Sequence, residues 1–314
     1  MEQLKGIHHV TAITGDAGRN LQFYSELLGQ RLVKKTVNFD DPGSYHLYYG
    51  DRLGTPGTLI TFFVWPGAGK GRRGIGEPVS FTYEVPVGAL SWWKERFASA
   101  HLPVQELGSI FGLPTIRITD PDGMQIELAE NASPRETEYW TGGNIPREFA
   151  LRSIRGVTLA HRNLTTSASL YTDQLHFHES GEESGHRRFL VGNTPDRSFV
   201  DVIVPATPAR GNMGAGTIHH VAFRTTSDET QGEWLKKIQK LGLNVSPVMD
   251  RNYFHSIYFR ELSGVLFEVA TDGPGMSIDE PTDHLGENLA LPRMYEGMRT
   301  RIEQSLPPLA VTLS

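Results

Sequence analysis

The chain of 314 residues contains no cysteine. This absence excludes disulfides, thiol catalysis and zinc–thiolate sites, so a bound metal must be held by histidine, aspartate or glutamate. No apolar run approaches the roughly 18 residues of a membrane-spanning helix, and the N-terminus lacks the charged-then-apolar pattern of a secretion signal. We therefore expect a cytoplasmic protein that does not associate with membranes.

Positive charge is also in short supply. There are 30 Lys and Arg residues against 36 Asp and Glu, a net charge of -6, which argues against a nucleic-acid partner. A small basic cluster (Lys70, Arg72 and Arg73) falls in a glycine-rich stretch without a Walker Lys-Ser/Thr pair, and we interpret it as an exposed loop. With 38% hydrophobic and 21% charged residues the chain is globular, and its length favours two domains.

The dipeptide His-His occurs twice, each time as Ile-His-His-Val, at residues 7–10 and 218–221. In an alternating strand whose valine faces the core, the second histidine of each pair, His9 or His220, points to the opposite face. His8 and His219 then point to the other side of the strand or to the rim, unless a bulge reverses the order. A 2-His-1-carboxylate metal site needs one acidic residue in addition.

The chain also repeats itself. Residues 141 apart match in two of its quarters, where Gly123 aligns with Gly264 and Glu127 with Glu268. An offset of 147 residues relates the other two quarters, in which Tyr24 aligns with Tyr171. Each quarter contains a strand, a helix and about three more strands. These four modules, numbered one to four, run roughly over 4–66, 76–132, 152–206 and 215–272.

The predicted fold class is α+β, with four βαβββ modules that form two incomplete-barrel cups. The expected divisions are an N-terminal domain over 1–135, a C-terminal domain over 150–276 and a tail over 277–314. Pro, Gly and Asn mark a linker at 131–146. Within the tail, residues 291–306 are predicted to form one amphipathic helix.

The pairing of the modules decides whether the site exists. If modules one and four share a cup, His9, His220 and Glu268 come together, and the fourth inward position, Thr61 or Phe62, offers no ligand. Sequential pairing of one with two and three with four would split this triad. We therefore predict the crossed pairing. The cup of modules two and three keeps Glu127 without a histidine, and we expect it to be structural.

Four strings carry a resemblance to the vicinal oxygen chelate (glyoxalase/bleomycin-resistance/extradiol dioxygenase) superfamily. The chain most closely resembles the hydroquinone ring-cleaving dioxygenases of the methylhydroquinone-responsive bacterial group, and the likeness covers essentially its whole length. The resemblance implies Fe(II), with Mn(II) as an alternative, at His9, His220 and Glu268. The strings are GIHHVTAI (6–13), YYGDRLGTPGT (48–58), DRNYFHSIYFR (250–260) and VLFEVATDGPG (265–275).

The resemblance also implies roles near the metal for His8, Thr11, His219, Arg251 and Tyr258. Tyr258 precedes the ligand carboxylate by ten residues across a tight turn, so it can face the metal as a hydrogen-bond donor or acid. Arg251 can hold an anionic substrate or oxygen species, since guanidinium stays charged. For each of these residues an ordinary structural role is the alternative. Strand parity places His255 on the face opposite Tyr258, which leaves its participation open.

These residues predict a dioxygenase that cleaves the ring of a hydroquinone or catechol with O2, as in the catabolism of aromatic compounds. One alternative is a metal-dependent glyoxalase-type lyase or isomerase, which normally needs a further carboxylate or Gln at the position of Thr61 or Phe62. Another is a metal-free small-molecule binding or resistance protein. The expected partners are a small aromatic diol and O2. A homo-oligomer is one alternative for the assembly, which the sequence leaves open.

Overall fold

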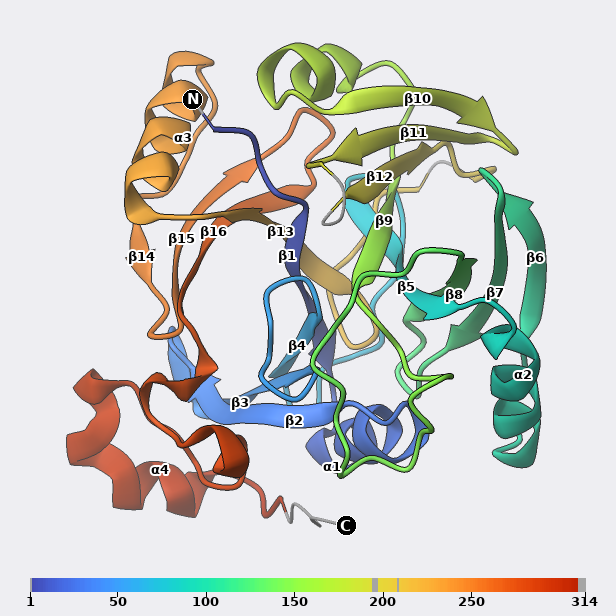
Figure 1. Ribbon diagram of the computed structural model, residues 1–314. Helices are drawn as coiled ribbons and strands as arrows, with labels where there is room; N and C mark the ends of the chain where they lie inside the picture. The colour runs from blue at the N-terminus through green and yellow to red at the C-terminus, as the bar shows by residue number, and fades with distance from the viewer. Residues whose placement is uncertain (1, 194–196, 208, 310–314) are drawn as a thin grey trace.

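The computed structural model describes residues 2–193, 197–207 and 209–309, and its strands form two curled sheets (Figure 1). The sheets lie side by side, with the helices on their outer surfaces (Figure 1). Each sheet has eight strands. This is the predicted α+β architecture of two incomplete barrels. In the described ranges, no helix combines the length and apolar character needed to cross a bilayer.

The first sheet joins modules one and four, which confirms the crossed pairing. Its centre is the antiparallel contact between β1 and β13, the strands that carry the two His-His pairs. In spatial order it contains β14 (Met249–Asp250), β15 (Phe254–Arg260), β16 (Leu266–Pro274), β13 (Ile218–Thr225), β1 (Ile7–Thr14), β4 (Leu59–Val64), β3 (Asp41–Gly50) and β2 (Arg31–Asn38). We call its concave side the first cup.

The second sheet joins modules two and three in the same way, with β5 paired to β9, and its concave side is the second cup. Each sheet therefore takes one module from each half of the chain, and the predicted domain boundaries at 135 and 150 stay a prediction. The strand order is β10 (His178–Glu183), β11 (His186–Val191), β12 (Ser198–Ile203), β9 (Ile154–Ala160), β5 (Glu77–Pro86), β8 (Gln125–Asn131), β7 (Leu113–Thr119) and β6 (Gln105–Ile110).

The module helices are unequal. The helices of modules two and four are α2 (Ala89–Ser99) and α3 (Asp228–Lys240), which completely bury Trp93 and Trp234, respectively. Module one has a short α1 (Ala17–Leu21) that continues as the π-helical turns of Gln22–Leu27. In module three the helix is reduced to the π-helical turn Leu170–Gln174.

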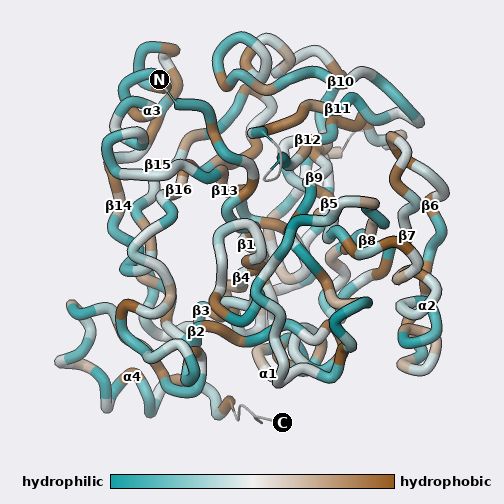
Figure 2. The backbone as a smooth tube through the Cα atoms, in the orientation of Figure 1, coloured by the Kyte–Doolittle hydropathy of each residue, from teal (hydrophilic) through white to brown (hydrophobic). Residues whose placement is uncertain are grey.

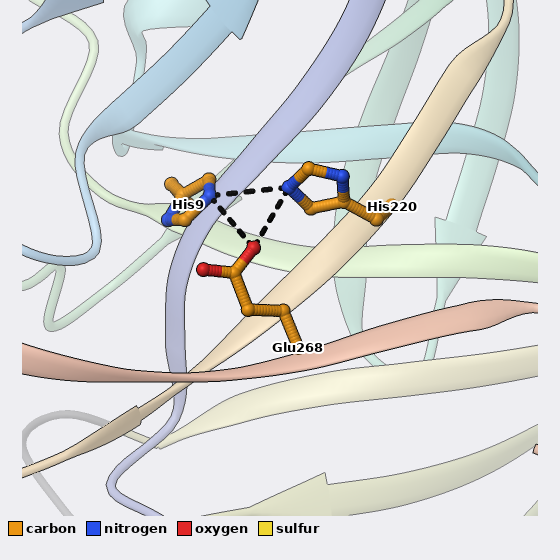
Figure 3. Close-up of side chains that lie close together, drawn as sticks. All are labelled: His9, His220 and Glu268. Atoms are coloured by element: carbon orange, nitrogen blue, oxygen red, sulfur yellow. Dashed lines mark hydrogen bonds and ion pairs between the residues drawn. The ribbon is translucent and has the colours of Figure 1, made fainter. Parts of the chain in front are cut away.

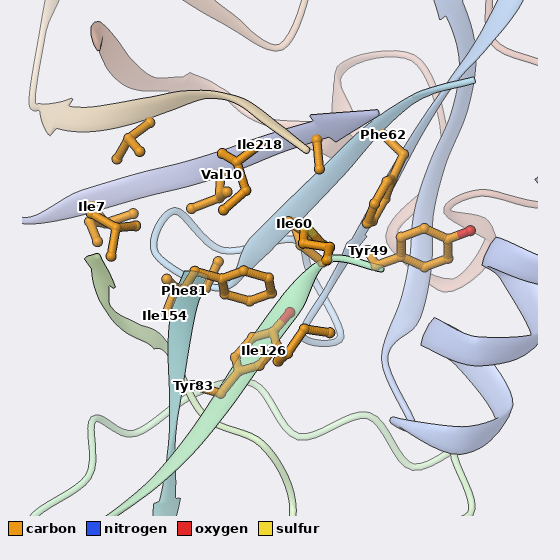
Figure 4. Close-up of a cluster of buried hydrophobic side chains, with 14 of the residues drawn as sticks. Ile7, Val10, Tyr49, Ile60, Phe62, Phe81, Tyr83, Ile126, Ile154 and Ile218 are labelled. Carbon is orange, nitrogen blue, oxygen red and sulfur yellow. The ribbon is translucent and has the colours of Figure 1, made fainter. Parts of the chain in front are cut away.

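The main hydrophobic core fills the space between the two sheets (Figure 4). Val10 of β1 and Ile60 of β4 belong to the same buried cluster as Phe81 and Tyr83 of β5, and all four are fully buried. Since strand residues alternate in direction, burial of Val10 on this side commits His9 to the first cup. The tube of the outer helix α4 is mainly hydrophilic (Figure 2).

The repeat extends to backbone conformation. Gly123 and Gly264, which align in the sequence, have φ angles of 102° and 103° in the turns that precede β8 and β16. An L-residue with a side chain rarely adopts this conformation, so the same turn sets the start of both strands. The carboxylates Glu127 and Glu268 thereby reach equivalent positions in the two cups.

The C-terminal helix is present, but the prediction of one helix over 291–306 was wrong in extent. The structure has a 3-10 segment over Arg293–Met298 and then the short α4 (Arg299–Ser305). Gly297 interrupts the predicted range, and glycine disfavours an α-helix by about 1 kcal/mol relative to alanine.

A buried ion cluster fastens the tail to the first sheet. Lys34 of β2 is completely buried, and its Nζ donates to Asp279 Oδ1 at 2.6 Å and to Glu280. The ammonium also lies 5.0 Å from the centre of the Tyr253 ring, whose hydroxyl donates to Asp279. The cluster connects the tail to the segment that precedes β15.

Replacement of Lys34 by methionine should lower the free energy of unfolding by about 3 kcal/mol, because the buried Glu280 carboxylate would lose its counter-ion. Urea denaturation followed by circular dichroism measures this effect. Lys94→Met is the matched control. It breaks an exposed ion pair with Glu106, which contributes at most about 1 kcal/mol. Equal effects of the two substitutions would contradict a stabilising role for the buried cluster.

Candidate metal centre

Three neighbouring strands bring His9, His220 and Glu268 together at the base of the first cup (Figure 3). His9 Nε2 lies 3.4 Å from His220 Nε2 and 3.4 Å from Glu268 Oε2. The distance from His220 Nε2 to Glu268 Oε2 is 2.8 Å. All three side chains are buried. Such separations are those expected of donors that share one ion with bonds of roughly 2 Å.

The predicted strand parity holds although the pairing of β1 with β13 is irregular. Register shifts occur between Ile7 and His9 and between Thr11 and Ala12. Thr11 lies opposite His220 in this ladder, so it stands beside the triad as predicted.

Each ligand histidine is hydrogen-bonded by the histidine that precedes it. The Nδ1 atoms of His8 and His9 are 2.9 Å apart, and those of His219 and His220 are 2.8 Å apart. When the second histidine of each pair donates from Nδ1, its Nε2 presents a lone pair to the centre, as a metal requires. Burial lowers the pKa of His8, and lowers the pKa of His219 to about 3, so both are neutral acceptors.

Only one oxygen of the Glu268 carboxylate accepts a hydrogen bond from the described residues. Ser256 donates to Oε1, whereas the buried Oε2 accepts no hydrogen bond from the described residues. Burial alone would raise the pKa of Glu268, but His9 and His220 hold it well below its usual value. Burial lowers the pKa of His220, which favours the neutral imidazole. One carboxylate oxygen and two imidazole nitrogens therefore converge on a point that a cation would stabilise.

Tyr258 faces this centre from β15. It lies directly opposite Glu268 in the antiparallel ladder, and its ring centre is 5.6 Å from that of His220. Its hydroxyl accepts a hydrogen bond from Arg251 Nε at 3.2 Å. Burial, followed by the Glu268 charge, raises the pKa of Tyr258, so the phenol keeps its proton. His255 points the other way and bonds Asp228 of α3 at 2.6 Å.

The first cup encloses a cavity of about 320 Å³ above the triad. A single aromatic ring fits in such a volume. Predicted site residues form part of its lining, namely His9, Thr11, His219, His220, Arg251 and Tyr258. His8 is not among the lining residues and lies behind His9. Further lining residues were not predicted from the sequence, among them Asn38, His46, Tyr48, Phe63, Trp65 and Phe254.

Three of these missed residues share a signal in the sequence. His46 and Tyr48 are two positions apart on β3, and Phe63 is two positions from Thr61 on β4, so each pair faces one side of its strand. The structure also resolves the choice at the fourth position of the cup. Thr61 is hydrogen-bonded to Thr11 and His46, whereas Phe62 packs in the core.

The second cup has the same scaffold, but its described residues do not form a cluster of two histidines and a carboxylate. Ser80 occupies the position that corresponds to His220, and it donates to Glu127 at 3.0 Å. Thr82 donates to the same carboxylate, and Arg117 contacts it at 2.6 Å. Arg117 aligns with Tyr258, so an ion pair replaces the phenol.

The remaining positions of the second cup are also filled. Gly156 takes the place of His9, and a side chain there would collide with the ring of Phe199, which would lie 2.1 Å from a Cβ atom. Asp201 corresponds to Thr61 and is paired with Arg188 at 2.7 Å. Both carboxylates of this cup are neutralised by arginine, in agreement with its predicted structural role.

Comparisons with known proteins identify relatives over nearly the full length. The "Putative ring-cleaving dioxygenase MhqO" of Bacillus subtilis (strain 168) is 42% identical over 98% of this chain and 97% of its own. The "Chlorohydroquinone/hydroquinone 1,2-dioxygenase" of Sphingobium indicum is 32% identical over 97% of each chain.

Solved structures and a family model agree with these relatives. A Bacillus subtilis crystal structure superposes with a TM-score of 0.94 at 42% identity and covers 99% of both chains. Glyoxalase I from Zea mays shares the fold, with a TM-score of 0.62 at 16% identity over 85% of this chain and 92% of its own. Residues 6–128 and 153–269 match the model of the Glyoxalase/Bleomycin resistance protein/Dioxygenase superfamily. The chain belongs to this superfamily.

Proposed function

We propose that this protein is a non-haem Fe(II)-dependent extradiol-type dioxygenase that cleaves the ring of a hydroquinone, or of a catechol, with O2. The observation that carries the proposal is the buried triad of His9, His220 and Glu268 beneath a cavity the size of one ring. The names of the full-length relatives support the reaction class, and one of them names hydroquinone. A small aromatic diol and O2 are the proposed partners, and the proposed location is the cytoplasm.

His9, His220 and Glu268 would hold the ion. When bound, it supplies a Lewis acid that lowers the pKa of a phenolic hydroxyl, and it offers open coordination sites on one face. Tyr258 stays protonated and donates a hydrogen bond toward the reacting oxygen atoms. Arg251 orients Tyr258 through its Nε–H and adds a fixed positive charge.

Aromatic side chains shield the same centre. Phe254 packs its ring 5.0 Å from that of His9, and Phe63 lies 5.4 Å from His219 at the rim. These contacts exclude water and give a flat ring apolar surfaces to lie against. Water exclusion strengthens each polar contact that remains inside the cup.

The alternatives fit less well. A glyoxalase-type lyase or isomerase would need a further carboxylate or Gln ligand at the position of Thr61, and threonine there is engaged with Thr11 and His46. A metal-free binding protein would leave the Glu268 Oε2 atom buried beside two imidazoles without a cation. Nitrogen and oxygen donors also accept Mn(II), which remains the alternative metal.

Protein purified without oxygen and reconstituted with Fe(II) should consume O2 when a hydroquinone is added. An oxygen electrode and a panel of substituted hydroquinones and catechols measure this activity and rank the substrates. Reconstitution with Mn(II) in parallel identifies the working metal. Absence of uptake with every dihydroxybenzene in the panel would rule out the proposed reaction.

Glu268→Ala should abolish stoichiometric metal binding, because it removes the anionic ligand. Glu127→Ala is the matched control, since it removes the aligned glutamate from the second cup. That variant should retain its metal and lose stability instead, because Arg117 would be left unpaired. Elemental analysis of the two reconstituted variants makes the comparison. Loss of metal from the Glu127 variant alone would assign the site to the wrong cup.

Tyr258→Phe should lower kcat about 100-fold, the usual effect of losing one donor near developing charge, while metal content stays unchanged. Tyr83→Phe removes a hydroxyl from the core between the sheets and serves as the control. Steady-state oxygen uptake gives both values. Full activity of the Tyr258→Phe variant would show that Tyr258 only lines the cup and has no catalytic role.

A further inference from the structure

A row of hydrogen-bonded side chains runs across the wall of the first cup from β1 to β3. Thr11 Oγ1 lies 2.8 Å from Thr61 Oγ1, which lies 2.9 Å from His46 Nε2. The other ring nitrogen, His46 Nδ1, lies 3.0 Å from the hydroxyl of Tyr48. All four residues are buried. We call Thr11, Thr61, His46 and Tyr48 the wall row.

The wall row contains one more polar hydrogen than it has internal hydrogen bonds. Three hydroxyl groups and one neutral imidazole carry four polar hydrogens, whereas the row makes three hydrogen bonds. One hydroxyl group therefore has no acceptor within the row, and this group is always at one of the two ends. If His46 donates from Nδ1 to Tyr48, the free O–H is that of Tyr48. If His46 donates from Nε2 to Thr61, the free O–H is that of Thr11.

The two ends face different parts of the cavity. Thr11 lies opposite His220 in the sheet and stands next to the metal centre. Tyr48 also lines the cavity, but its strand is separated from β1 by β4. Neighbouring strands are about 4.8 Å apart, so the β3 backbone is roughly 10 Å from that of β1. The row thus runs from Thr11, beside the metal centre, to Tyr48, two strands away.

A para-diol presents the matching arrangement. Its two oxygen atoms lie on opposite sides of one ring, so a single ion cannot bind both. When one oxygen reaches the triad, the other must meet the wall of the cup. We infer that His46 donates from Nδ1 to Tyr48, and that the Tyr48 hydroxyl then donates a hydrogen bond to the ring oxygen remote from the metal and thereby selects para-diols. This inference rests on the proposed function and names the substrate class of the same site.

The surroundings of Tyr48 fit a donor of this kind. Burial raises the pKa of the Tyr48 hydroxyl well above its usual value, so it keeps its proton. Burial also lowers the pKa of His46, which makes its ring neutral and able to donate at one nitrogen and accept at the other. Among the described residues, the Tyr48 hydroxyl is bonded to His46 alone. Its second bond is available to a ligand.

The test compares dissociation constants of hydroquinone and phenol for the Fe(II)-loaded protein, measured by calorimetry without oxygen. Wild-type protein should prefer hydroquinone, and Tyr48→Phe should reduce the preference about fivefold to tenfold, the worth of one hydrogen bond. Tyr49→Phe is the matched control. Tyr49 is equally buried, but it points into the core. The Tyr49→Phe variant should therefore prefer hydroquinone over phenol as strongly as the wild type does.

The ratio of the two dissociation constants separates recognition of the second hydroxyl from distortion of the cup, because a distorted cup weakens the binding of both ligands. If Tyr48→Phe does not fold, 4-methoxyphenol tests the wild type, since its ether oxygen can accept but not donate. It should bind more tightly than phenol; binding no tighter than phenol would overturn the inference. A preference unchanged by Tyr48→Phe would overturn it too, while oxygen uptake with hydroquinone would still support the proposed function. Failure of hydroquinone both to bind and to drive uptake would overturn both.

Discussion

The antiparallel pairing of β1 with β13 is the contact on which the metal centre depends. It joins the first and last modules of the chain and sets the two His-His pairs side by side, with β16 as the next strand. Successive residues of β1 point to opposite faces of the sheet, so Val10 packs in the core between the sheets and His9 points into the cup. A slip by one residue would bury the ligands in the core and destroy both features.

The two cups differ in charge balance and share their backbone plan. In the second cup, Arg117 and Arg188 neutralise the carboxylates, and Phe199 fills the remaining space. In the first cup, Glu268 faces two imidazoles, and no arginine directly contacts its carboxylate among the described residues. Burial makes an ionised carboxylate costly unless it has a counter-charge, so a cation is the missing partner of the first cup.

The sequence was sufficient to predict the triad and the crossed pairing, because both follow from an internal repeat and from period-two alternation. It could not choose between Thr61 and Phe62, since that choice depends on where the register of β4 falls. The wall contributed by His46 and Tyr48 was also missed, because lateral neighbours in a sheet leave no mark at fixed spacing along the chain. The predicted extent of the C-terminal helix was wrong for a local reason, because Gly297 interrupts the predicted range.

The proposed activity depends on one metal ion held by the first cup. Diffraction from crystals of the Fe(II)-reconstituted protein, recorded at the iron absorption edge, locates that ion directly. We predict a single anomalous peak about 2 Å from His9 Nε2, His220 Nε2 and Glu268 Oε2. A peak in the second cup near Glu127, or no peak within bonding distance of the triad at full metal loading, would contradict the assignment of the metal site to the first cup.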